Sequence, residues 1–78
     1  MSKITNTTAT INLDGTFKVH GIDYVFVGEY DNYREMDYEA GAMLRVHPKG
    51  YVCHVETNKP NEYVLILPKG SEYLIVNE

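Results

Sequence analysis

The residues with the greatest capacity for chemistry lie close together, in the segment EYDNYREMDYEAG at positions 29–41. Positions 29–39 hold five carboxylates and one arginine, which together account for the whole formal net charge of −4. Tyrosines are interleaved with the acids, and tyrosine is enriched where proteins bind tightly, while charge steers association. The segment therefore predicts a surface for a protein partner that is itself basic. The residues predicted to form this surface are Glu29, Tyr30, Asp31, Arg34, Glu35, Asp37, Tyr38 and Glu39.

The acidic segment also has a plainer interpretation. Runs of charge are usual on the solvated side of a helix, so the segment could be surface without a further role. Carboxylates bind hard cations as well, but the segment has no run of the form Asp-x-Asp-x-Asp-Gly, which builds a calcium loop. We therefore predict no metal site and no cofactor.

Cys53 and His54 are the other pair with reactive side chains. Neighbouring residues of a strand point to opposite faces, so these two cannot act together as nucleophile and base. We expect His54 to be a partly buried sheet histidine opposite Leu44, and Arg45 to lie opposite Cys53. His47 is expected on the Cys53 face, but one cysteine and scattered histidines are a weak basis for a zinc site.

Residues suited to catalysis are otherwise scarce. Ser2 and Ser71 are the only serines, and neither has a histidine near it in the sequence. The six glycines are separate turn or cap residues and form no phosphate-binding loop. Nothing in the pattern indicates the apolar environment that raises the pKa of a catalytic acid. We therefore predict that the protein is not an enzyme.

Composition narrows the class of protein further. The 78 residues are 44% apolar and 23% charged, as expected of one small globular domain over 1–78. The negative charge argues against direct binding to nucleic acid, which needs a basic surface. Nothing approaches the roughly 20 apolar residues of a membrane span, and the start MSKITNTTATINL does not resemble a signal peptide. With one cysteine and no disulfide, a cytoplasmic location is expected.

Strands are indicated by short β-branched and aromatic runs between Gly and Pro turns. In ATINLDGTFKV, a three-residue loop LDG pairs Ile11 with Phe17 and gathers the apolar side chains on one face, whereas a two-residue DG loop would separate them. We prefer the first register. A following turn at His-Gly places Lys18 opposite Asp23 as an ion pair.

The tripeptide Pro-Lys-Gly occurs twice, twenty residues apart. Pro suits the first central position of a turn and Gly suits a left-handed residue after it, so both copies predict a bulged hairpin. The first hairpin would pair Val46 with Val52, and the second would pair Ile66 with Glu72. Turn chemistry alone produces such matching hairpins, so we do not infer a duplication.

The acidic segment itself fits a short helix over 32–40. Asn32 can cap its start with Glu35 as capping-box partner, and Gly41 is placed where a left-handed C-terminal residue belongs. The side chains expected to face the sheet are Tyr33, Met36 and Ala40. Those expected to face outward are Arg34, Glu35, Tyr38 and Glu39.

These elements predict a mainly β fold. Six or seven short strands in an antiparallel meander would form an SH3-like or half-open barrel with one short α-helix near 32–40. Segments 63–67 and 73–76 are apolar on both faces, so their hairpin should be central or covered. A curled sheet with one helix packed on it is the alternative.

The sequence thus favours a small acidic binding protein that blocks or modulates a larger partner, such as one that binds nucleic acid, through segment 29–39. A short, acidic, tyrosine-rich chain without a catalytic set is similar in general character to phage or mobile-element accessory proteins, although no motif carries that likeness. Two alternatives stay open. One is an oligomeric binder of a small molecule or nucleotide, with its pocket between subunits, and the other is a structural subunit of a larger assembly.

Overall fold

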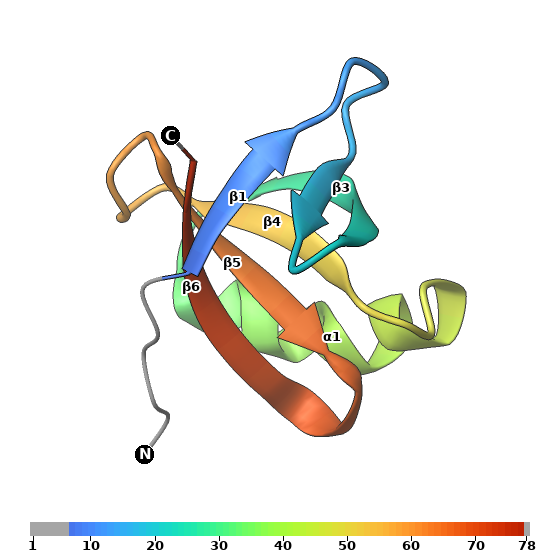
Figure 1. Ribbon diagram of the computed structural model, residues 1–78. Coiled ribbons are helices and arrows are strands. Elements are labelled where there is room, and N and C mark those ends of the chain that lie inside the picture. Colours follow the sequence, from blue (N-terminus) through green and yellow to red (C-terminus); the bar gives the residue numbers. More distant parts are fainter. Residues whose placement is uncertain (1–6, 78) are drawn as a thin grey trace.

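The computed structural model describes residues 7–77, which form a small barrel with a helix on its outside (Figure 1). The elements are β1 (Thr7–Ile11), β2 (Phe17–Val19), β3 (Ile22–Tyr30), α1 (Tyr33–Val46), β4 (Tyr51–Val55), β5 (Glu62–Leu67), the 3₁₀ turn η1 (Pro68–Gly70) and β6 (Ser71–Asn77). The predicted mainly β fold, a small barrel with one helix, is confirmed.

The barrel is closed, and its strands follow the order of the sequence from β1 to β6. Four of the neighbouring pairs are antiparallel, as predicted. The pairs β3–β4 and β1–β6 are parallel, so the prediction of an antiparallel meander throughout is wrong at these two places. A parallel neighbour requires a long crossover connection, and α1 supplies it between β3 and β4. Pairing of β1 with β6 closes the sheet that residues 7–77 form and leaves it without an open edge.

Turn chemistry fixes the hairpin registers as the sequence predicted. Ile11 pairs with Phe17 across the first loop, and Gly15 in that loop has the positive φ of 89° that the bulged turn requires. Across the next turn, Lys18 Nζ lies 3.0 Å from Asp23 Oδ1. In the last hairpin Ile66 pairs with Glu72, as predicted.

The two Pro-Lys-Gly tripeptides adopt different structures. The second one forms η1 within the β5–β6 hairpin, where Lys69 as well as the glycine after it has a positive φ. The first one comes just after α1, where the His47 N–H donates to the Met43 carbonyl over 2.8 Å and closes the helix. The same tripeptide therefore ends a helix in one place and turns a hairpin in the other.

The helix continues past the predicted end at residue 40 and reaches Val46. The predicted pairs Val46–Val52 and Leu44–His54, and the placement of Arg45 opposite Cys53, are therefore wrong. Strand β4 is already paired on both edges, with β3 and with β5, so no edge remains for a strand at 44–46. As a helix, this stretch instead packs Met43 and Leu44 against the barrel.

Two apolar cores hold the fold together. The first fills the barrel and takes side chains from all six strands: Ala9, Phe17, Val19, Tyr24, Val52, Leu65 and Ile75. The second lies between α1 and the outer face of the barrel: Met36, Tyr51, Cys53, Val55, Val64 and Ile66. β4 and β5 supply alternate residues to the two cores, so both of their faces are buried. In the final hairpin this confirms the predicted covering for β5, whereas in β6 only Ile75 is buried and the other residues from Ser71 to Val76 are half-buried or exposed.

Candidate functional site

The acidic segment is divided between the end of β3, a short turn and the first half of α1. Asn32 is extended and its side-chain oxygen accepts a 2.9 Å hydrogen bond from the Glu35 N–H, so the predicted N-cap is confirmed. Glu35 also lies in the first turn, where a negative charge interacts favourably with the helix dipole. The cap therefore fixes where the helix begins and which of its residues face outward.

The four residues predicted to face outward are exposed, but Tyr33, predicted to face the sheet, is 39% exposed as well, because its hydroxyl reaches out to Asn58 in the β4–β5 loop. Met36 is fully buried against the barrel, whereas Tyr38, two positions on, is 89% exposed. Arg34 and Glu35 flank Tyr38 on the solvent side and are exposed too, as is Asp31 in the turn before the helix. We call these four residues, Asp31, Arg34, Glu35 and Tyr38, the outer α1 surface.

The other members of the acidic segment make contacts within the protein. The Tyr30 hydroxyl donates to Glu39 Oε1 over 3.1 Å, and burial together with this carboxylate raises the pKa of Tyr30 to about 12. Glu29 Oε2 lies 2.9 Å from His54 Nδ1 on the neighbouring strand β4. Tyr30, Glu39 and Glu29 therefore tie the segment to the barrel.

Asp37 also faces the barrel, where it meets Glu72 of β6. Burial of Glu72 and its hydrogen bond to Asp37 raise the pKa of Glu72 to about 7. Two carboxyl groups this close share a proton more readily than they both ionise. Sequence analysis missed Glu72, although the register that pairs it with Ile66 places both side chains on the face that α1 covers.

The eight residues predicted to bind a partner thus form two groups. The outer α1 surface keeps Asp31, Arg34, Glu35 and Tyr38 available, and neither of the two ion pairs found in residues 7–77 involves them. The remaining four, Glu29, Tyr30, Asp37 and Glu39, have partners inside the protein. Glu29, Asp37 and Glu39 are exposed too, so what distinguishes the outer α1 surface is that its side chains are not engaged in the contacts found among residues 7–77.

Cys53 and His54 point to opposite sides of β4, as expected. Cys53 is fully buried beneath α1, and burial raises the pKa of its thiol to about 12, which leaves little thiolate for reaction. His54 is partly buried, as predicted, but its partners are Glu29 and the Lys59 carbonyl. His47 caps α1 and does not lie on the Cys53 face of a strand. Within residues 7–77, no three His, Cys, Asp or Glu side chains are grouped as a metal site.

Comparisons of the chain with protein-family models, with curated proteins and with solved structures found no match. The function of the protein must therefore be inferred from its own residues. In the part of the chain that the structure describes, α1 is too short and too polar to cross a membrane.

Proposed function

We propose that the protein is a non-enzymatic binding protein that blocks or modulates a larger protein partner through the outer α1 surface. The observation that carries this proposal is the exposure of Tyr38, 89% of whose surface is open to solvent in the middle of a capped helix. An exposed tyrosine offers a large, rigid contact area at low entropic cost. A side chain of this kind suits the anchor of an interface better than it suits the surface of an isolated domain.

Charge indicates the kind of partner. The outer α1 surface carries Asp31 and Glu35 beside Arg34, and the other three acids of segment 29–39 add negative charge next to it in the sequence. A basic protein surface, such as the nucleic-acid-binding face of another protein, is complementary to this charge, and the carboxylates would occupy the place of phosphates. The likeness in general character to phage or mobile-element accessory proteins agrees with an inhibitory role in the cytoplasm.

The contacts that hold α1 rigidly against the barrel favour a role in binding a partner. The Asn32 cap, the Tyr30–Glu39 hydrogen bond and the buried Met36 hold α1 to the barrel before any partner arrives. A preformed surface loses less conformational entropy on binding than a flexible one does. Cys53 is buried and its neighbour His54 points to the other face, so these two do not form a nucleophile and base.

Affinity capture with the full-length chain from its native host, followed by binding measurements with the purified partner, tests the proposal. Tyr38→Ala should weaken binding by about 30-fold or more, the loss typical of a hot-spot residue. Glu35→Lys should slow association and reduce its dependence on salt.

Two matched controls lie away from the helix. Leu13→Ala removes another fully exposed large side chain, in the β1–β2 loop, and Glu56→Lys makes the same charge change in the β4–β5 loop. Both controls should bind as the wild type does. If Tyr38→Ala and Glu35→Lys bind equally well, the outer α1 surface is not the interface and the proposal is wrong.

A further inference from the structure

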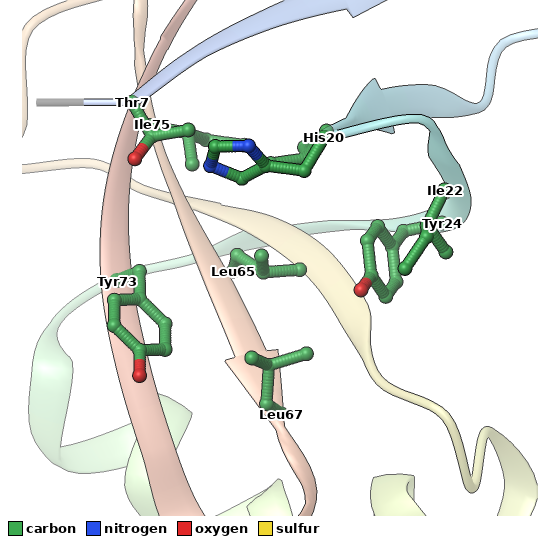
Figure 2. A pocket seen from close by; sticks show the side chains of 9 residues that line it. Thr7, His20, Ile22, Tyr24, Leu65, Leu67, Tyr73 and Ile75 are labelled. Carbon is green, nitrogen blue, oxygen red and sulfur yellow. The ribbon is translucent and has the colours of Figure 1, made fainter. Parts of the chain in front are cut away.

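The barrel has a pocket at the end where the β2–β3 turn meets the β5–β6 hairpin. Its volume is about 350 Å³, near the lower end of the range for small-molecule sites. Figure 2 shows Leu65 and Leu67 lying between Tyr73 on one side and Tyr24 on the other, with His20 at the rim. This pocket belongs to one chain and is separate from the outer α1 surface.

Five of the nine residues that line the pocket are aliphatic, and the other four, Thr7, His20, Tyr24 and Tyr73, each carry a polar group. Val19, Ile22, Leu65, Leu67 and Ile75 form most of its wall. Among residues 7–77, no Asp, Glu, Lys or Arg lines it. A charged ligand would therefore lose its hydration without gaining an ion pair, whereas an uncharged apolar molecule would gain from leaving water.

Tyr24 supplies a fixed polar group in this apolar setting. Its side chain is only 6% exposed, and its hydroxyl points into the pocket (Figure 2). None of the side-chain hydrogen bonds found within residues 7–77 involves this hydroxyl. The hydroxyl is not one of the buried unpartnered polar atoms of residues 7–77, so it is open to the pocket and can donate to a ligand acceptor.

The ring of Tyr24 is held in position by the chain beneath it. Gly50 lies so close that a Cβ added there would come within 3.3 Å of Tyr24 Cε1. Lys49 Nζ is 5.9 Å from the centroid of the same ring. The hydroxyl is therefore held in place before a ligand binds, which is the arrangement that favours specific recognition.

We propose that this pocket binds a small uncharged molecule, aromatic or short aliphatic, that carries one hydrogen-bond acceptor such as a carbonyl. The apolar part rests on Ile22 and Leu67, the accessible aliphatic side chains of the wall, and the acceptor takes the hydrogen bond of the Tyr24 hydroxyl. The site lies within a single chain, whereas the sequence pointed to a ligand pocket between subunits. It does not depend on the outer α1 surface, so either proposal can fail without the other.

Acetophenone and ethylbenzene are a matched pair of probes, because they are similar in size and only acetophenone has a carbonyl. Each is titrated into the full-length ¹⁵N-labelled chain while the backbone amide shifts are recorded. Both should bind saturably and shift the amides of Val19, Leu65 and Ile75, and acetophenone should bind more tightly. Absence of saturable binding, or shifts confined to other parts of the barrel, would overturn the proposal.

Tyr24→Phe isolates the hydrogen bond because it keeps the ring. It should weaken acetophenone binding about five-fold, the usual effect of one neutral hydrogen bond, and leave ethylbenzene binding unchanged. Tyr38→Phe, on the far helix, is the control and should alter neither. Equal weakening of both probes by Tyr24→Phe contradicts the assigned role of the hydroxyl.

Ile22→Trp narrows the mouth of the pocket at a half-exposed position, where a larger side chain can be accommodated. It should abolish binding of both probes while the remaining amide spectrum stays that of a folded barrel. Analytical ultracentrifugation of the same samples distinguishes a ligand site from a dimer contact. A wild-type dimer that Ile22→Trp converts to a monomer would show that a second copy occupies the pocket and would overturn the proposal.

Discussion

The carboxyl group of Glu72 on β6 faces that of Asp37 on α1, so an acidic pair lies where the helix meets the barrel. Burial of Glu72 and the nearby Asp37 raise the pKa of Glu72 from 4.5 to about 7. The folded protein therefore holds a proton that the unfolded chain releases near pH 4.5. The contribution of this proton to the free energy of unfolding is fully present below about pH 4.5, and it is lost as pH rises through about 7.

Glu72→Gln should remove this dependence on pH. The amide keeps a donor for Asp37 and carries no charge, so the variant should be more stable than the wild type at pH 8, by about 1 kcal/mol once solvent screening is allowed for. Urea unfolding between pH 5 and 8.5 measures the difference. Glu56→Gln, at an exposed loop position, should leave the curve unchanged. If the free energy of unfolding changes with pH in the same way for Glu72→Gln and the wild type, the pKa of Glu72 is not raised by folding.

A second group changes charge in the same range of pH. His54 has both ring nitrogens near acceptors, with Nδ1 2.9 Å from Glu29 Oε2 and Nε2 3.0 Å from the Lys59 carbonyl. Burial lowers the pKa of His54, but the Lys59 carbonyl and Glu29 together outweigh it and raise the pKa above its ordinary value of 6.5. The charged ring therefore contributes to the free energy of unfolding. This contribution is fully present below the pKa that His54 has in the unfolded chain, and it is lost as pH rises through the pKa that His54 has in the folded protein.

Glu29→Gln should lower the pKa of His54, because it removes the negative partner and keeps a side chain of similar size. NMR titration of the His54 ring proton measures the shift directly. The variant should lose more stability at pH 5.5 than at pH 8.5, because the stability from the charged ring is present at low pH and falls as pH rises through the folded pKa. Glu56→Gln, at an exposed loop position, serves as the control. A His54 titration that Glu29→Gln leaves unchanged would contradict the proposed ion pair.

Local chemistry made three of the four predicted hairpins predictable, the exception being the one at the first Pro-Lys-Gly, which follows α1. The loop with Gly15, the turn at His20 and the loop at Pro68 each fix a register through the conformations that their residues favour. The start of the helix was equally clear, since the side chain of Asn32 can reach only the N–H groups of the next few residues. In each case the information lies within a few residues of the turn or cap.

The end of the helix was not predictable in this way. The stretch AMLRV at 42–46 is apolar enough for a strand, and Gly41 resembles a helix end. The outcome is decided by tertiary structure, because β4 is paired on both edges and Met43 and Leu44 gain burial against the barrel. A glycine in the middle of a helix costs about 1 kcal/mol, less than that burial returns.

The candidate sites differ in the same way, because one follows from local sequence and the other depends on tertiary structure. The outward position of Tyr38 followed from helical periodicity, which is local. The contact of Asp37 with Glu72 and the pocket beside Tyr24 join elements far apart in the sequence, so they depend on the closed barrel. The outer α1 surface could therefore be named from sequence, and the pocket could not.

The Asn32 cap makes the stability of α1 testable on its own. Asn32→Ala leaves the Glu35 N–H without its acceptor and should cost about 1 kcal/mol. For a domain of this size, that loss lowers the Tm by about 4–8 °C. Asn32→Asp keeps an acceptor and should unfold close to the wild-type temperature, as should Asn61→Ala at an exposed loop position. Equal Tm values for Asn32→Ala and the wild type would mean that the cap contributes nothing to stability.

Two glycines provide the sharpest contrast in the chain. Gly50 has a φ of 117°, and a Cβ there would lie 2.6 Å from the Ile66 carbonyl oxygen. Gly41 lies inside α1, and a Cβ there would meet nothing within 4 Å. The same substitution by alanine therefore has opposite physical consequences at the two positions.

Gly41→Ala should stabilise the protein by about 0.5–1 kcal/mol, because alanine favours the helix and restricts the unfolded chain. Gly50→Ala should destabilise it by about 2 kcal/mol or more, because the backbone is strained and the Ile66 carbonyl must move. Urea unfolding of the two variants beside the wild type gives both values. A destabilising Gly41→Ala would mean that the helix is interrupted at residue 41, as the sequence first indicated, and a neutral Gly50→Ala would mean that the β4–β5 packing beside Tyr24 is looser than described.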